Sequence, residues 1–184
     1  MNAPQPILSP LKAARRARIV AAALQVFLAT GYRGATMEGV AAAAGLSKVT
    51  LYGYFPDKDA VFAAVAQVVL DRLRDAAFTA LAAPGPVADR IAAALVAKHG
   101  LFHDLVRASA FAADLLANRD RVRDQAAALD DALIHNMAAL LGNDRQARLI
   151  FHAAKGVAEA ASDRAGIGAD IRTLVAALAG IAPA

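Results

Sequence analysis

The stretch from Thr36 to Lys58 constrains the fold most, because its capping residues and its central glycine define two short helices joined by a tight turn. Thr36 is a good N-cap, since its hydroxyl can accept a hydrogen bond from the first turn of the helix that follows. An alanine-rich turn and a half then runs to Gly45, which is predicted to end the first helix. Ser47 follows as the N-cap of the second helix.

The second helix of this stretch has two different faces. Leu51 and Phe55 lie four residues apart and are predicted to turn inward. The opposite side is predicted to carry Lys48, Val49, Tyr52 and Gly53. One face therefore anchors the helix, and the other is free to contact a partner.

A short helix that exposes a lysine and a tyrosine, braced by a preceding helix, has the geometry of a helix-turn-helix, whose second helix enters the DNA major groove. The alternative is an ordinary corner between two helices, because glycine-centred corners are common in all-α proteins. The next residues favour DNA binding. Asp57 is a predicted N-cap for a third helix, where Lys58 and backbone N–H groups can share one phosphate.

The basic side chains are concentrated in the same part of the chain. Residues 1–58 hold seven lysines and arginines against two acidic residues, whereas the remainder holds 13 basic and 14 acidic side chains. A basic segment followed by a nearly neutral one is expected of a head that binds a polyanion and a body that does not. A merely solvated basic helix face is the alternative.

A set of residues spread over about residues 12 to 65 follows the pattern of a known family. The set comprises Ile19, Val20, Phe27, Gly31, Tyr32, Thr36, Val40, Ala41, Ala44, Gly45, Leu46, Ser47, Leu51, Tyr52, Tyr54, Phe55 and Lys58. In these positions the segment resembles the N-terminal domain of the tetracycline-repressor (TetR) family. The resemblance implies a two-fold dimer whose last two long helices pair into a four-helix bundle, and middle helices that enclose a pocket for a small effector.

The resemblance also implies which residues contact DNA. They are Thr36, Ser47, Lys48, Val49, Thr50, Tyr52, Gly53, Tyr54 and Lys58. Two of these positions depart from a polar reading surface: Val49 can meet a thymine methyl group, whereas Gly53 offers no side chain. We therefore expect little direct base readout and a large contribution from contacts to the DNA backbone.

The composition favours helix nearly everywhere, because hydrophobic residues make up 58% of the chain, many of them alanine, and no alternating stretch predicts a strand. We predict an all-α fold with an N-terminal three-helix helix-turn-helix domain, followed by a helical bundle for ligand binding and dimerisation. Residues 1–11, with three prolines, are predicted to be a disordered arm. Residues 12–57 would form the DNA-binding domain and residues 58–184 the regulatory and dimerisation domain.

The predicted helices follow from the periodicity and its breaks. One helix runs from about Leu11 to Thr30 and stops at Gly31, and a long one runs from Asp59 to about Ala83, before Pro84-Gly85-Pro86. Further helices are expected at about 87–99, 101–117, 120–141, 144–162 and 169–180. Their breaks are assigned to Gly100, Asn118, Gly142-Asn143 and Gly166–Gly168, and Asp144 and Asp170 are placed near helix starts.

Residues suited to catalysis are scarce. The chain has no cysteine, no Gly-x-Ser-x-Gly motif and no phosphate-binding glycine loop. His99 and His103 lie four residues apart on one helix face, but two imidazoles make an incomplete metal site. We predict no metal, no cofactor and no enzymatic activity.

Two further sets of residues predict partners for the second domain. Phe78, His99, Phe102, His103, Phe111, Met137, Phe151 and His152 are candidates for a site that binds a small apolar or weakly polar effector, with simple core packing as the alternative. Leu149, Ile150, Val157, Ile171, Leu174, Val175 and Leu178 offer more apolar surface than two terminal helices normally expose. The second set predicts a homodimer through the C-terminal helices.

These features together predict an effector-released repressor that binds a palindromic double-stranded DNA operator as a dimer. One alternative is an all-α small-molecule binding protein whose helix-turn-helix is only structural. Another is an enzyme built on a helical bundle. The sequence has no uncharged apolar run of about 18 residues and no apolar N-terminal region, so we expect no membrane association and a cytoplasmic location.

Overall fold

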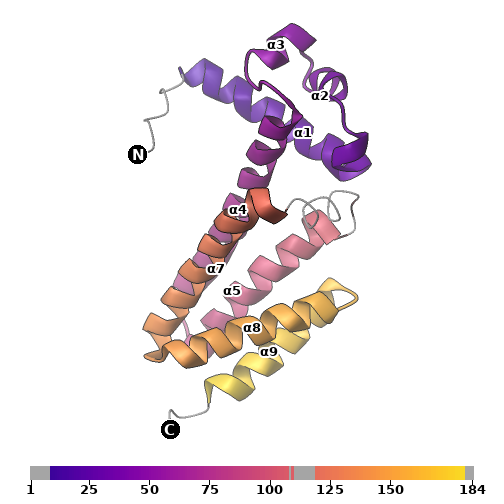
Figure 1. The fold of residues 1–184 in the computed structure, drawn as a ribbon. Coiled ribbons are helices and arrows are strands. Elements are labelled where there is room, and N and C mark those ends of the chain that lie inside the picture. Colours follow the sequence, from indigo (N-terminus) through magenta and orange to yellow (C-terminus); the bar gives the residue numbers. More distant parts are fainter. Residues whose placement is uncertain (1–8, 108, 110–118, 181–184) are drawn as a thin grey trace. The chain divides into compact units, whose positions relative to one another are not determined.

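The computed structural model describes residues 9–107, 109 and 119–180 of the chain. None of these residues forms a β-strand, and the all-α fold is confirmed (Figure 1). The described residues divide into two compact units, one of residues 9–68 with 109 and the other of the rest. The division falls inside one long helix, and the domain limits expected from the sequence remain a prediction.

The first unit contains the helix-turn-helix segment. It comprises α1 (Pro10–Gly34), α2 (Met37–Ala43), α3 (Lys48–Tyr52) and the first turns of α4 (Lys58–Ala82). The helical conformation of α1 is interrupted at Gly31, whose φ of 69° lies in the left-handed region that glycine adopts without a Cβ clash. This interruption confirms the predicted stop.

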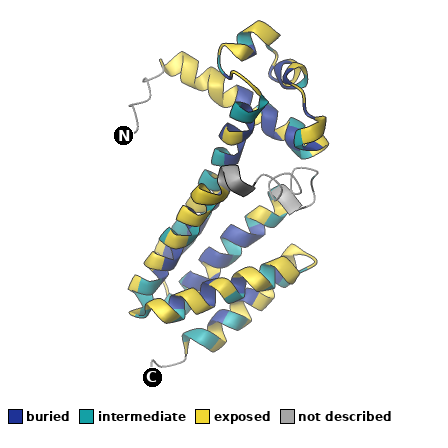
Figure 2. Ribbon diagram, viewed as in Figure 1, coloured by how far each residue is buried: buried dark blue, intermediate teal, exposed yellow. Residues whose placement is uncertain are grey.

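An aromatic cluster joins α1 to the start of α4 within the first unit. Phe27 and Phe62 are buried and meet edge to face, with ring centroids 5.8 Å apart. Tyr32 lies beside both rings, 5.2 Å from the centroid of Phe62. Ile19 and Ala23 continue the buried face of α1, as the helical spacing predicts (Figure 2).

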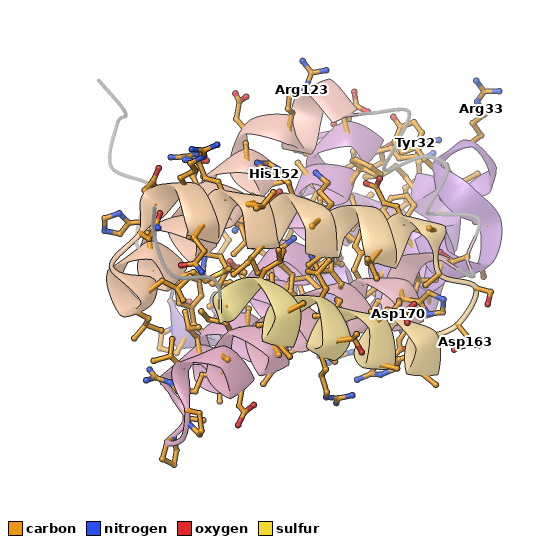
Figure 3. The ribbon with its side chains drawn as sticks, turned by 90° about the horizontal axis from the view of Figure 1, so that it is seen from below. Tyr32, Arg33, Arg123, His152, Asp163 and Asp170 are labelled. Atoms are coloured by element: carbon orange, nitrogen blue, oxygen red, sulfur yellow. The ribbon has the colours of Figure 1, made fainter. Side chains whose placement is uncertain are left out.

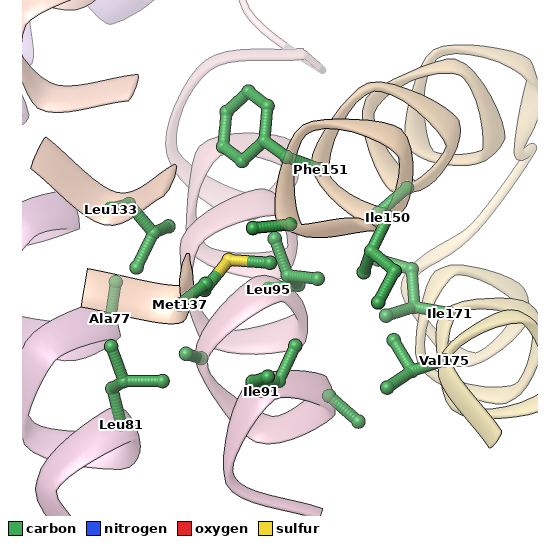
Figure 4. Packing of buried hydrophobic residues seen from close by; sticks show 14 of the residues in the cluster. Ala77, Leu81, Ile91, Leu95, Leu133, Met137, Ile150, Phe151, Ile171 and Val175 are labelled. Atoms are coloured by element: carbon green, nitrogen blue, oxygen red, sulfur yellow. The ribbon is translucent and has the colours of Figure 1, made fainter. Parts of the chain in front are cut away.

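The second unit is a bundle. After the later turns of α4 come α5 (Val87–Phe102), the π-helical turn η1 (His103–Arg107), α7 (Arg119–Leu141), α8 (Asp144–Ala160) and α9 (Arg164–Ala179). α5 packs against α8 and α9, and α8 also packs against α7 and α9. The core contains Ala77, Leu81, Ile91, Leu95, Leu133, Met137, Ile150, Phe151, Ile171 and Val175 (Figure 4).

Three glycines that were predicted to break helices lie inside them instead. Gly100 lies within α5, and Gly166 and Gly168 lie within α9. A Cβ at Gly100 would lie 3.4 Å from the guanidinium of Arg164, and one at Gly168 would lie 3.2 Å from that of Arg172. Gly100 and Gly168 therefore leave room for side chains that approach the helix, and the predicted helix breaks at these glycines are wrong.

The start of α9 was also misplaced. Asp163 is its N-cap and accepts a hydrogen bond from the backbone N–H of Gly166 at 2.8 Å, whereas Asp170 lies within the helix (Figure 3). The predicted break at residues 142–143 is confirmed, since Gly142 has a φ of 67° and Asn143 caps α8. Most of the helix expected at 101–117, with Asn118, lies outside the described residues.

No helix among residues 9–107, 109 and 119–180 has both the length and the apolar character that crossing a membrane requires.

Candidate nucleic-acid interface

Local hydrogen bonds form the helix-turn-helix as the sequence predicts. The Thr36 hydroxyl accepts a bond from the backbone N–H of Gly39 at 3.0 Å, and the Ser47 hydroxyl accepts one from that of Thr50 at 3.1 Å. Gly45 occupies the left-handed region with a φ of 66°, which ends α2 and redirects the chain. Both N-caps and the turn glycine are confirmed.

The two faces of α3 differ as predicted. Leu51 is fully buried and Phe55, just after the helix, is 2% exposed. On the other side Val49 is 84% exposed and Tyr52 is 44% exposed. The buried Leu51 fixes this short helix, and the opposite side exposes an apolar valine to solvent. Such a surface suits a partner that itself offers apolar groups, such as the thymine methyl groups in a DNA major groove.

Lys48 is held by an acidic residue from the preceding helix. Its ammonium forms an ion pair with Glu38 of α2 and lies 5.9 Å from the ring centroid of Tyr52. The hydrogen bond to Glu38, followed by the attraction between the charges, raises the pKa of Lys48, and the same bond lowers the pKa of Glu38. Sequence reasoning did not identify Glu38 as part of the site, because the pair forms across the turn.

The hydroxyl groups predicted to contact DNA already have local roles. Those of Ser47 and Thr50 lie 2.8 Å apart, and that of Thr36 caps α2. Each is exposed or partly exposed and keeps capacity for a further bond, since a hydroxyl offers one donor and two acceptor lone pairs. Their contacts to DNA, like the contact from Gly53, remain predictions.

A basic groove lies beside the N-terminal part of α1. It has a volume of about 500 Å³ and is lined by Ser9, Leu11, Lys12, Ala14, Arg15, Arg18 and Tyr54. Three cations along one groove make a favourable path for a phosphate backbone. Arg18 also donates to the backbone oxygen of Ala44 at 3.2 Å, which ties α1 to the end of α2. Arg33, by contrast, is exposed and points away from the protein (Figure 3).

Lys58 lies in a set of contacts within the protein. Its ammonium donates to the backbone oxygens of Tyr32 at 2.8 Å and Ala35 at 3.0 Å, and lies 4.3 Å from the ring centroid of Tyr32. The Tyr32 hydroxyl donates in turn to Asp59. We call Tyr32, Lys58 and Asp59 the clasp, because they join the end of α1 to the first turn of α4. Asp57 caps α4 through the N–H of Ala60 at 2.8 Å, as predicted.

The residues predicted to bind an effector do not form one pocket among the described residues. His99, Phe151 and His152 lie together, since the ring centroid of Phe151 is 6.2 Å from that of His99 and 5.6 Å from that of His152. Phe78 lines a different groove of about 280 Å³, whose lining includes no histidine. Met137 is fully buried in the core, Phe102 is 38% exposed, His103 is partly exposed, and Phe111 lies outside the described residues. The effector site itself remains a prediction.

Three residues assigned to the dimer surface are buried within the protomer. Ile150, Ile171 and Val175 are at most 1% exposed, because they form the seam between α5, α8 and α9. Leu149, in contrast, is 55% exposed, and Val157, Leu174 and Leu178 are partly exposed. The prediction that Ile150, Ile171 and Val175 belong to the dimer surface is therefore wrong. No group of three or more potential metal ligands occurs among the described residues.

Residues 19–65 match the sequence profile of a family described as "Bacterial regulatory proteins, tetR family". The HTH-type transcriptional regulator RutR of Escherichia coli (strain K12) is 41% identical over 58 residues, which are 32% of this chain. That match spans 27% of RutR, so the chain covers about a quarter of the length of this relative.

The likeness to solved structures extends over most of the chain. A tetR-family transcriptional regulator from Streptomyces coelicolor aligns with a TM-score of 0.72 and 20% identity, over 90% of this chain and 80% of that one. A TetR-like transcriptional regulator from Rhodococcus sp. RHA1 aligns with a TM-score of 0.69 and 27% identity, over 92% of this chain and 98% of that one. The helical second unit therefore shares the fold of these regulators as well.

Proposed function

Because the chain belongs to the TetR family of transcriptional regulators, we propose that it is a repressor that binds a palindromic operator as a homodimer and leaves it when a small effector binds. The observation that carries this proposal is the outer face of α3. Val49 and Tyr52 are held in solvent beside the ion-paired Lys48, while Leu51 fixes the helix from the other side. Catalysis forms no part of the proposal.

The division of labour at the interface follows from the contacts. The groove of Lys12, Arg15 and Arg18 supplies charge for the DNA backbone and sets the strength of binding to any duplex. The outer face of α3 supplies the base contacts, in which Val49 meets a thymine methyl and Lys48 a guanine edge or a phosphate. Tyr54 lines the basic groove, and its hydroxyl donates a hydrogen bond to the DNA backbone that lies along this groove.

A dimer gives this interface its second half. Recognition helices of a two-fold dimer meet half-sites about one DNA turn (~34 Å) apart, which makes the operator palindromic. The outer faces of α8 and α9 suit the contact, because both helices expose small residues and α8 also exposes Leu149. The small residues are Gly156 and Ala160 on α8 and Ala169, Thr173, Ala176 and Ala177 on α9. Small residues let helices approach closely, and Leu149 supplies an apolar anchor.

For an effector to release the protein from DNA, it must bind more tightly to a form of the dimer in which the spacing of the recognition helices does not match the operator. A preference of ~1–3 kcal/mol lowers operator affinity about five- to 150-fold. The second unit offers polar atoms for such a ligand, since His99 Nε2 and His103 Nδ1 are buried and have no hydrogen-bond partner among the described residues. α4 contributes residues to both units and is the natural route for the coupling.

Fluorescence anisotropy with the duplex upstream of the protein's own gene, and with a scrambled duplex of equal composition, tests the proposal. We expect tight binding to the first duplex only, and Lys48→Met to reduce the difference between them. Arg148→Met is the matched control, because Arg148 is an exposed cation paired with Asp144 in the second unit. Equal, weak binding of both duplexes at low salt would instead favour a small-molecule binding protein with a structural helix-turn-helix.

A further inference from the structure

A charged cluster lies where three helices of the second unit meet. Lys98 of α5 donates to one carboxylate oxygen of Asp130 of α7 at 2.9 Å, and the ammonium of Lys155 of α8 lies 3.8 Å from the other. The Lys98 side chain is 11% exposed and its ammonium lies 5.1 Å from the ring centroid of the buried Phe151. We call Lys98, His99, Asp130 and Lys155 the buried charge cluster.

The cluster carries more positive than negative charge. Among the described residues, two ammonium groups form ion pairs with the one carboxylate of Asp130; the side chain of Lys155 is 47% exposed, whereas Lys98 is deep enough that loss of hydration lowers its pKa, despite the opposing attraction of Asp130. Burying the ammonium of a lysine with only part of its charge balanced costs free energy on folding. The reason is that an ion that has lost its hydration needs a full set of opposite charges and hydrogen bonds. Such an arrangement suits a site that receives a further negative charge.

His99 adds a neutral polar group to the same place. It is 8% exposed, and its Nε2 has no hydrogen-bond partner among the described residues. Burial, aided by the charges of Lys98 and Lys155, lowers the pKa of His99 to about 3, so the ring is neutral at neutral pH. A neutral imidazole can carry its proton on either nitrogen, and Nε2–H would donate to an oxygen atom without adding charge.

We propose that Lys98, Lys155 and His99 bind a small organic anion, with a carboxylate or a similar acid on an apolar body, and that Asp130 supplies the negative charge internally until that anion displaces it. The apolar body of the ligand lies against the ring of Phe151, which is near both Lys98 and His99. This inference rests on the proposed effector release, because it gives the chemical class of the effector.

The charges decide between ligand classes. A cationic ligand would face two ammonium groups, and a neutral one could not replace Asp130 as the charged partner of Lys98. An anion that displaces Asp130 keeps the ammonium of Lys98 paired and gains charge-assisted hydrogen bonds, which are about twice as strong as neutral ones. The expectation from sequence was an apolar or weakly polar effector, which remains a prediction, whereas the buried charge cluster favours an amphipathic acid.

The experiment compares acids with their amides, which have nearly the same shape and no charge. Benzoate, phenylacetate, hexanoate and octanoate are titrated into the full-length protein by calorimetry at neutral pH, each beside its primary amide. We expect at least one acid to bind roughly tenfold or more tightly than its amide, as one charge-assisted contact would give.

Two variants should shift acid binding in opposite directions. Lys98→Met keeps an unbranched apolar side chain but removes the ammonium, and should abolish the preference for the acid. Asp130→Asn removes the internal competitor and should tighten acid binding several-fold while leaving amide binding unchanged. Asp144→Asn is the control, because it breaks the exposed pair with Arg148 on α8 and should change neither.

A merely structural ion pair gives a different pattern, in which both variants lower the melting temperature and neither changes the ratio of acid to amide binding. That pattern, or binding of no acid at millimolar concentration, would overturn the inference. Operator binding is measured on the same samples. Release of DNA by neutral compounds alone would leave the proposed function standing without this site, whereas acid binding without release would leave the site standing without the proposed coupling.

Discussion

Replacing Lys58 by methionine should weaken the DNA-binding unit from within. The change keeps a long apolar side chain but removes the ammonium that donates to the backbone oxygens of Tyr32 and Ala35 and lies over the Tyr32 ring. Both oxygens belong to the corner between α1 and α2, which positions the helix-turn-helix. The clasp therefore affects DNA binding indirectly, because it fixes the position of the helix-turn-helix within the first unit.

The contacts set the size of the effect. A hydrogen bond that involves a charged group contributes about 1.5–3 kcal/mol, and an exposed cation–π contact about 0.5–1 kcal/mol. Lys58 is partly exposed, so water can replace part of these contacts, and we take about 2–3 kcal/mol for the whole set. For a chain of this length that corresponds to a fall in melting temperature of about 4–12 °C.

Calorimetry and salt titrations of operator binding test this reasoning together. We expect Lys58→Met to lower the melting temperature and the affinity for every duplex while leaving the salt dependence unchanged, since the ammonium is already engaged by the protein. Lys12→Met, which removes an exposed cation of the basic groove, is the matched control and should do the reverse. A parental melting temperature with a salt slope reduced by about one counterion would restore Lys58 as a phosphate contact and refute the structural role.

Three further predictions concern other contacts. Glu38→Gln should strengthen binding to operator and random duplex alike, because it removes a negative charge from the proposed DNA interface; anisotropy titrations measure both affinities. Gly156→Ala should raise the free energy of unfolding of the protomer in urea by about 0.8–1.0 kcal/mol, because a Cβ there meets nothing of its own chain within 4 Å; in the proposed dimer the same Cβ should weaken association, so the gain should be seen at protein concentrations low enough to dissociate the dimer. His99 has a pKa of about 3 when folded against 6.5 in its unperturbed state, so the unfolded chain binds the extra proton and stability should fall as the pH drops from 6.5 towards 3; His99→Leu should flatten this part of the pH profile of the melting temperature.

Contacts between near neighbours were predictable from the sequence. The caps formed by Thr36, Ser47 and Asp57 join each side chain to an N–H three residues later, so residue type and spacing are enough to infer them. The left-handed turns at Gly45 and Gly142 follow from the same local rules. This is why the helix-turn-helix, and with it the fold class, could be predicted.

Contacts between distant residues could not be predicted in the same way. The partners of Lys58 lie 23 and 26 residues away, and Lys98 meets Asp130 only because α5 packs beside α7. The amino-acid composition does not show which charged residues meet in the fold. In the sequence, a lysine that pairs with a carboxylate inside the bundle looks the same as a lysine that only faces water. Lys98, Asp130 and Lys155 were missed for this reason, although His99, the fourth member of the buried charge cluster, was identified.

Some residues assigned to the dimer surface were predicted incorrectly because each helix was considered separately, without the helices that pack against it. Ile150 and Val175 are large and apolar, and they were assigned to a partner protomer because α8 and α9 come last in the chain. In the structure these residues are buried by packing against α5, and small residues such as Gly156 and Ala176 lie on the outer faces. A second protomer can come closest where side chains are smallest, so the strongest disruption is expected from bulk rather than from charge. Gly156→Trp should therefore yield monomers by sedimentation while the protomer keeps its helix content, because a side chain at this position has open space within its own chain.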